Sequence, residues 1–178
     1  MEHLIALDEN GRMVPTDQET PARTVAGLLD GPLDQPALLR RAGVGLLVLG
    51  RREEAVDLLE RALAHADDRL AIAVHINLGD AHRYCGEPDA AEPHYQRALD
   101  LSEAHAPELL SFCFQHLGKQ RLDQGRTAEA RALLEMALRQ RRAEGNPSLV
   151  AATETALRLV DRAEAVESAA DGSASRAR

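Results

Sequence analysis

The stretch that decides the fold runs from Ala37 to Asp67 and reads ALLRRAGVGLLVLGRREEAVDLLERALAHAD. Two further stretches share its layout: AVHINLGDAHRYCGEPDAAEPHYQRALDLSE from Ala73 to Glu103, and FCFQHLGKQRLDQGRTAEARALLEMALRQRR from Phe112 to Arg142. Each has a glycine in its first half, a second glycine seven residues later, an alanine five residues further on and another alanine seven residues after that. Self-similarity at a regular spacing is typical of repeat proteins, so these copies predict a stacked array.

The small residues have a mechanical role. The first glycines (Gly43, Gly79 and Gly118) and the alanines have almost no side chain, so two helices can approach closely where they cross. The second glycines (Gly50, Gly86 and Gly125) come where a helix ends in a left-handed conformation that glycine adopts freely. Each copy therefore predicts a helix–turn–helix hairpin, and such hairpins must stack to bury their apolar faces.

Composition agrees with helices and excludes several classes of protein. Hydrophobic residues make up 44% of the chain but aromatic residues only 2%, which leaves leucine and alanine to build the core. A formal net charge of −8 argues against nucleic acid as a partner. The two cysteines are too few for a disulfide scaffold. The longest near-apolar run, from Ala42 to Gly50, is too short for a membrane span, and an acidic N-terminal segment does not resemble a signal peptide.

We therefore expect a cytoplasmic protein without a membrane partner. Arginine greatly outnumbers lysine, since Lys119 is the only lysine, and this bias is typical of a GC-rich genome and indicates a bacterial source.

The predicted fold class is all-α, with four parts along the chain. Residues 1–35 carry two short extended runs around Asn10-Gly11, a strong hairpin signal, and then a short helix over Thr24–Asp30. Residues 36–146 hold three helix–turn–helix repeats, at about 36–69, 72–105 and 111–144. Residues 147–167 form a capping helix that Asn146 can cap. Residues 168–178 have the composition of a disordered tail.

The leucine–glycine pair, the turn glycine and the later Glu-Ala and Ala-Leu pairs resemble the tetratricopeptide repeat. The first glycines are 36 and then 39 residues apart, which is similar to the longer-helix variant found in kinesin light chains. The resemblance implies a right-handed α-solenoid that binds ligands in a concave groove lined by the first helix of each repeat.

Carried over by position, this groove contains eight candidate partner-binding residues: Arg40, Asn77, Asp80, Arg83, Tyr84, Gln115, His116 and Lys119. The cations predict attraction to an acidic or carboxylate-bearing segment of a partner. A second reading stays open, in which Asp80 and Arg83, three residues apart, simply pair with each other on one helix turn. The apolar inner face of repeat one (Val44, Leu47 and Val48) indicates that the N-terminal hairpin or the following helix covers it.

Metal and enzyme chemistry find no support in the sequence. His75, His82, Cys85 and His116 lack the tight local spacing of a zinc site, and we expect them to be packing or surface residues. No nucleophile, phosphate-binding or dinucleotide-binding motif is present. We therefore expect no metal, no cofactor and no enzymatic activity.

The sequence thus predicts a protein–protein interaction adaptor that holds a peptide or helix of its partner in the groove. Two alternatives stay open. The chain could be a peptide-sensing subunit that works with a separate regulator chain, or a scaffold that self-associates, for example as a homodimer.

Overall fold

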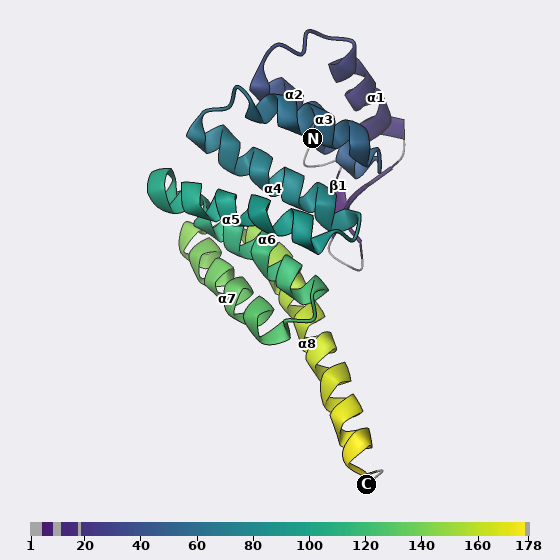
Figure 1. Ribbon diagram of the computed structural model, residues 1–178, viewed down its shortest axis with the longest axis vertical. Coiled ribbons are helices and arrows are strands. Elements are labelled where there is room, and N and C mark those ends of the chain that lie inside the picture. Colours follow the sequence, from purple (N-terminus) through teal and green to yellow (C-terminus); the bar gives the residue numbers. More distant parts are fainter. Residues whose placement is uncertain (1–4, 9–11, 18, 177–178) are drawn as a thin grey trace. The chain divides into compact units, whose positions relative to one another are not determined.

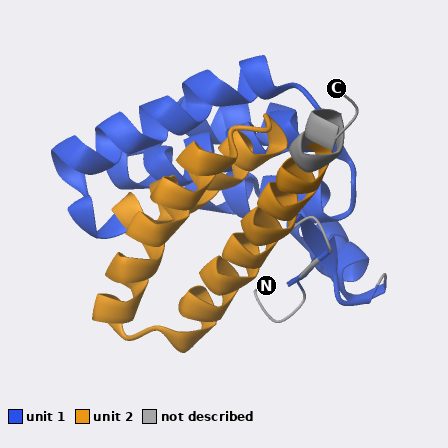
Figure 2. Cartoon of the chain, turned by 90° about the horizontal axis from the view of Figure 1, so that it is seen from below, with its two compact units in different colours: residues 1–109 blue, residues 110–178 orange. Residues whose placement is uncertain are grey.

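The computed structural model describes residues 5–8, 12–17 and 19–176, and it divides the chain into two compact units, residues 1–109 and 110–178 (Figures 1 and 2). Unit 1 contains β1 (Ile5–Leu7), β2 (Met13–Pro15), α1 (Glu19–Leu29), α2 (Pro36–Val48), α3 (Arg52–Leu63), α4 (Asp68–Tyr84), α5 (Pro88–His105) and a 3₁₀ turn, η2 (Pro107–Leu109). Unit 2 contains α6 (Leu110–Asp123), α7 (Thr127–Glu144) and α8 (Pro147–Arg176). The predicted all-α repeat fold with a short N-terminal hairpin is confirmed.

Helix–turn–helix pairs make up most of both units. In unit 1, α2 packs against α3, α4 packs against α5, and α3 also contacts α4. In unit 2, α7 packs against both α6 and α8. The core of unit 1 is built mainly from α2, α3 and α4, together with Val25 of α1. In unit 2, Ala130 and Leu134 of α7 pack against Ala156 and Val160 of α8. These small and branched side chains fill the interface at close packing, as the low aromatic content requires.

The turn glycines end the first helix of each repeat as predicted. Gly50, Gly86 and Gly125 have φ of 77°, 75° and 72°. At the first of them the backbone N–H of Gly50 donates to the carbonyl of Leu47, and that of Arg51 donates to the carbonyl of Leu46. This pair of bonds satisfies carbonyls at the helix end that would otherwise lack donors.

The first glycines allow the close approach. A Cβ on Gly43 would lie 2.9 Å from Cγ of Leu59, and a Cβ on Gly118 would lie 2.8 Å from Cγ of Leu134. At Gly79 the neighbour is an aromatic ring, and a Cβ would lie 2.5 Å from Cε1 of Tyr95. In each repeat the second helix thus places a large side chain in the space that the glycine leaves open.

The N-terminal part is a two-stranded antiparallel hairpin in which Ala6 pairs with Val14. The predicted turn at Asn10-Gly11 lies outside the described residues. Helix α1 begins at Glu19, five residues before the predicted start at Thr24. The reason is Asp17, whose carboxylate accepts the backbone N–H of Thr20 at 2.7 Å and so serves the first turn of the helix.

The C-terminal helix differs from the predicted boundary at residue 167, because α8 runs to Arg176. Asn146 caps its start as expected, accepting the backbone N–H of Leu149 at 3.3 Å. Arg131 of α7 holds α8 through ion pairs of 2.6 Å to Asp161 and 2.7 Å to Glu164. Beyond these contacts the segment contains several alanines, whose helix propensity lets the helix continue where Ser and Gly indicated a tail. Among the described residues, no helix combines the length and apolar character needed to cross a membrane.

Replacing Gly79 by alanine tests the close approach of α4 and α5. Because Tyr95 is only 1% exposed, its ring has little room to move away from a new Cβ. We expect Gly79→Ala to lower the free energy of unfolding by about 1–3 kcal/mol in urea denaturation. Gly27→Ala in α1 is the matched control, since a Cβ there meets nothing within 4 Å, and alanine should raise helix stability by up to about 1 kcal/mol. Equal effects at the two positions would contradict this account of the repeat.

Candidate functional site

The predicted groove positions of unit 1 lie along α2 and α4, and we call the surface that they form the α2–α4 face. It is defined by Arg40, Val44 and Leu47 of α2 and by Asn77 and Tyr84 of α4. Helix α2 contacts α4 directly, so residues 37 positions apart in the sequence become neighbours. The pairing of the two helices brings the polar residues to one end of this face and an aromatic residue to the other.

At the polar end, Nε of Arg40 donates to Oδ1 of Asn77 at 2.9 Å. Arg40 is half-buried, and its burial lowers the pKa of the guanidinium. Asn77 is 6% exposed, so the amide oxygen that accepts this bond belongs to a buried side chain. Within the described part of the chain no other hydrogen bond or ion pair holds Arg40, and the bond to Asn77 uses only Nε. The two terminal nitrogens can therefore donate side by side to a carboxylate.

Asp80 and Arg83, in contrast, are structural residues inside unit 1. The hydroxyl of Tyr95 donates to Oδ1 of Asp80 at 2.8 Å, and Nε of Arg83 lies 3.7 Å from the same oxygen. The side chains of Arg83 and Asp80 are 1% and 0% exposed. Burial raises the pKa of Tyr95 well above its usual value, and the carboxylate of Asp80 raises it further. The reading in which Asp80 and Arg83 pair on one helix turn therefore describes them better than the reading in which they face a ligand.

At the other end of the face, Tyr84 is covered by the N-terminal hairpin. The backbone N–H of Met13 donates to the hydroxyl of Tyr84 at 3.0 Å. The guanidinium groups of Arg12 and Arg83 lie 5.7 Å and 5.0 Å from the centroid of the tyrosine ring. Strand β2 packs on α2, and Met13 joins the core cluster that includes Leu47 and Tyr84. The hairpin, which lies beside one end of α4, thus covers the Tyr84 end of the face, while α1 also packs against α2 (Figure 1).

The other three predicted groove residues lie on α6 in unit 2. Gln115 and Lys119 are 3% and 7% exposed, and His116 is half-buried. Of the eight predicted residues, therefore, only Arg40 and His116 are not buried. The repeat pattern identifies which residues occupy the groove positions of the family, but it does not indicate how far each side chain is buried.

Sequence reasoning missed Met13, Arg12 and Tyr95. The signal for Tyr95 was present, because repeats one and three have Leu59 and Leu134 at the same place. A hydroxyl in the middle of an apolar contact needs a hydrogen-bond partner, and this predicts a polar neighbour such as Asp80. Nothing in the sequence indicated which residues of the hairpin would contact α4, because that depends on how the hairpin docks.

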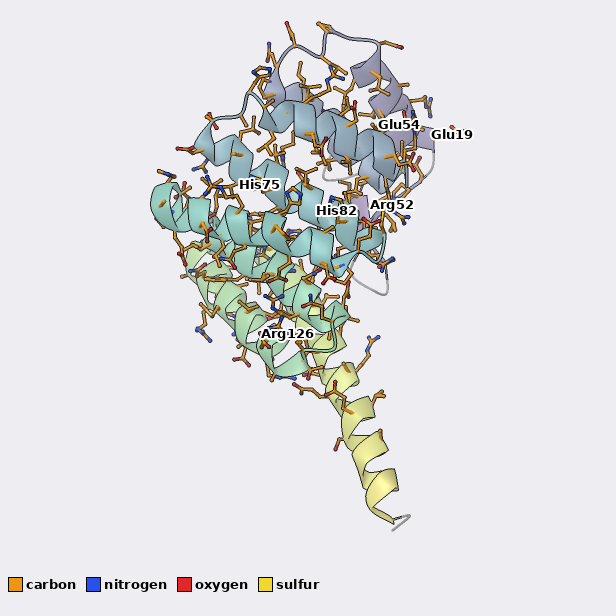
Figure 3. The ribbon with its side chains drawn as sticks, in the orientation of Figure 1. Glu19, Arg52, Glu54, His75, His82 and Arg126 are labelled. Atoms are coloured by element: carbon orange, nitrogen blue, oxygen red, sulfur yellow. The ribbon has the colours of Figure 1, made fainter. Side chains whose placement is uncertain are left out.

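A histidine cluster lies between α4 and α5 on a different side of α4. Nδ1 of His75 lies 3.1 Å from Nδ1 of His94, and the ring of His82 stacks on that of His94 with centroids 5.6 Å apart. Nδ1 of His82 also lies 2.9 Å from a carboxylate oxygen of Glu87. Figure 3 labels His75 and His82 on α4. Among the described residues, no group of three or more His, Cys, Asp or Glu side chains could hold a metal ion.

The histidine cluster makes the stability of unit 1 depend on pH. Burial lowers the pKa of His75 to about 4, helped by His94 and Arg97. Burial and His82 lower the pKa of His94, against a smaller opposing effect of Glu60. In the unfolded chain these histidines bind protons at a higher pH, near their ordinary pKa of about 6.5. The free energy of unfolding therefore keeps its full value above that pH and falls as the pH drops toward about 4.

We therefore expect the free energy of unfolding, measured in urea between pH 7 and pH 4, to fall less steeply in His75→Gln than in the unaltered chain. His65→Gln, at an exposed position, is the control and should keep the original slope. Parallel slopes in all three proteins would contradict the assignment of the acid sensitivity to this cluster.

Comparison with known proteins identifies the repeats. Residues 34–104 match the family model described as tetratricopeptide repeat. The crystal structure of MamA protein has a TM-score of 0.55 and 18% identity, with 72% of this chain and 68% of that chain covered. The crystal structure of BtubC (BKLC) from P. vanneervenii has a TM-score of 0.54 and 18% identity, with 85% of this chain and 72% of that chain covered.

At this level of identity the two structures show the fold alone. No curated protein sequence matches the chain. The resemblance of these repeats to the longer-helix variant found in kinesin light chains stays a prediction. The family match, the glycine-dependent helix pairs and the likeness to these two structures lead to one conclusion: residues 34–104 match the tetratricopeptide repeat family, and the chain has the fold of a tetratricopeptide repeat array.

Proposed function

We propose that this protein is an adaptor that binds a short acidic or carboxylate-bearing segment of another protein on the α2–α4 face. The tetratricopeptide repeat fold supports binding of another protein in general terms. The single observation that carries the more specific proposal is the Arg40–Asn77 pair, which holds a half-buried guanidinium in place by one 2.9 Å bond.

The electrostatics of Arg40 favour an anion. A guanidinium that is partly removed from water loses hydration without gaining a counter-charge, so a carboxylate that reaches it regains much of that loss. A bidentate arginine–carboxylate contact would also fix the orientation of the bound segment. The contact is local, and it is compatible with the overall charge of −8 because interactions between exposed charges are screened beyond about 8–10 Å at physiological salt.

The burial of the remaining predicted groove residues supports a site with fewer cations than the sequence indicated. Arg83 and Lys119 are buried, at 2% and 7% exposure, so the proposed cationic contact rests on Arg40 rather than on a row of cations. Asp80 and Tyr95 are bonded to each other inside unit 1, where they stabilise α4 on α5. This use of the buried acid and phenol for packing is in keeping with a binding role instead of catalysis.

The proposal is tested by comparing two neighbouring arginines on α2. Arg41 is exposed, while Arg40 is half-buried beside Asn77, so the pair separates a site effect from a change of net charge. We expect Arg40→Glu to lower the binding of the captured partner about tenfold or more, because a charge-assisted contact worth about 1.5–3 kcal/mol is replaced by repulsion. Arg41→Glu should bind like the unaltered chain.

The measurement is affinity capture from the protein's native host, followed by titration of the purified partner against each variant. Equal losses in the two variants would point to a general charge effect, and equal retention would place the site elsewhere on the chain. The mass of the unaltered protein in solution tests self-association at the same time. A homodimer that Arg40→Glu leaves intact, with no partner captured, would favour the scaffold alternative.

A further inference from the structure

The N-terminal hairpin occupies part of the surface that the proposed function assigns to a partner. Met13 donates its backbone N–H to Tyr84 and packs into the cluster that contains Leu47. Both of these residues belong to the α2–α4 face. At the other end of the same face, Arg40 bonds to Asn77, and no hydrogen bond or ion pair joins Arg40 to the described residues of the hairpin. The face therefore has a polar end, where Arg40 and Asn77 bond to each other, and an apolar end that the chain covers with its own residues.

The hairpin is suited to leave this position. Its strands are three residues long, and an isolated two-stranded hairpin is only marginally stable in water. Arg12, Met13, Val14 and Pro15 are all half-buried rather than buried, so the hairpin lies on the surface of the core and is not part of its interior. The helices beneath it keep their own apolar contacts through Leu46, Leu58 and Leu59, which are at most 6% exposed.

We infer that the hairpin is an internal competitor, which a partner segment must displace from the Leu47–Tyr84 end of the α2–α4 face. This inference rests on the proposed function, and it specifies the partner segment. The segment is extended, carries an apolar side chain that replaces Met13, and supplies a donor to the hydroxyl of Tyr84. Its carboxylate reaches Arg40 at the polar end.

The helix geometry sets the spacing between these two groups. Asn77 and Tyr84 are seven residues apart on α4, which corresponds to about 10 Å along a helix that rises 1.5 Å per residue. An extended chain covers that distance in about three residues, at about 3.3 Å each. The matching segment thus has an apolar residue and an acidic group, or a terminal carboxylate, about three residues apart.

Tethering explains how such a small hairpin can compete. Residues 16–18 join β2 to α1, so the hairpin stays close to its binding surface at an effective concentration in the millimolar range. The apparent affinity of any segment that needs the same surface equals its intrinsic affinity multiplied by the fraction of molecules in which the hairpin is released. A substitution that releases the hairpin should therefore strengthen binding, which is the opposite of what damage to a binding site does.

The experiment uses the full chain and a labelled synthetic peptide with the sequence of residues 4–16, LIALDENGRMVPT, as the probe. Met13→Glu places a charge against the apolar face and releases the attached hairpin. Met136→Glu is the matched control, because Met136 is an exposed methionine on α7 in unit 2. Fluorescence anisotropy should show the peptide binding Met13→Glu at least tenfold more tightly than Met136→Glu or the unaltered chain. Circular dichroism confirms that each variant has kept its helices.

Equal affinities for the two variants, or no binding to either, would overturn the inference. If Met13→Glu does not fold, hydrogen exchange in the unaltered chain takes its place. There, excess unlabelled peptide should increase exchange of the Met13 amide, and an unchanged rate would overturn the inference.

A final competition separates this inference from the proposed function. Partner protein captured by the unaltered chain should displace the peptide from Met13→Glu. Failure to displace it, while Arg40→Glu still weakens capture, would overturn the hairpin inference and leave the binding function standing. Failure of Arg40→Glu to affect capture would instead remove the proposed function, whatever the peptide titration shows.

Discussion

The close contact between the two helices of each repeat is the constraint on which the rest of the structure depends. Gly43, Gly79 and Gly118 leave no room for even one added methyl group against the second helix. A packed interior transmits such a restriction, because side chains around it have few alternative positions. In repeat two the opposing residue is Tyr95, whose hydroxyl needs an acceptor, and this requirement places Asp80 inside unit 1. Arg83 then lies beside the buried carboxylate.

Helix α4 links stability to the proposed function because its sides serve different purposes. One side carries His75 and His82 against α5, and the opposite side carries the buried Asp80 between Asn77 and Tyr84, which bond to α2 and to the hairpin. Substitutions on α4 will therefore mix effects on folding with effects on binding. Arg40 and Met13 are better probes, since Arg40 belongs to α2 and Met13 to β2, and neither takes part in the α4–α5 packing.

Much of the fold could be predicted because it depends on local chemistry. Positive φ at Gly50, Gly86 and Gly125 follows from the need to end a helix, and the hairpin follows from two short extended runs around a turn signal. The candidate site could be predicted only in part. The family pattern indicated Arg40 and Asn77, which do meet, but it also indicated Arg83 and Lys119, which are buried. Burial depends on neighbours that are distant in sequence, and a repeat pattern does not contain them.

By itself, the sequence determined the helix–turn–helix repeats and their turn glycines, since each of these depends on residues within a few turns of one another. Tertiary structure alone decided that Asp80 and Tyr95 bond to each other, that Met13 contacts Tyr84 from 71 residues away, and that Arg40 bonds to Asn77 through Nε. The physical reason is that the pairing of polar groups and the exclusion of water are properties of packed surfaces. Those surfaces exist only once distant parts of the chain have come together.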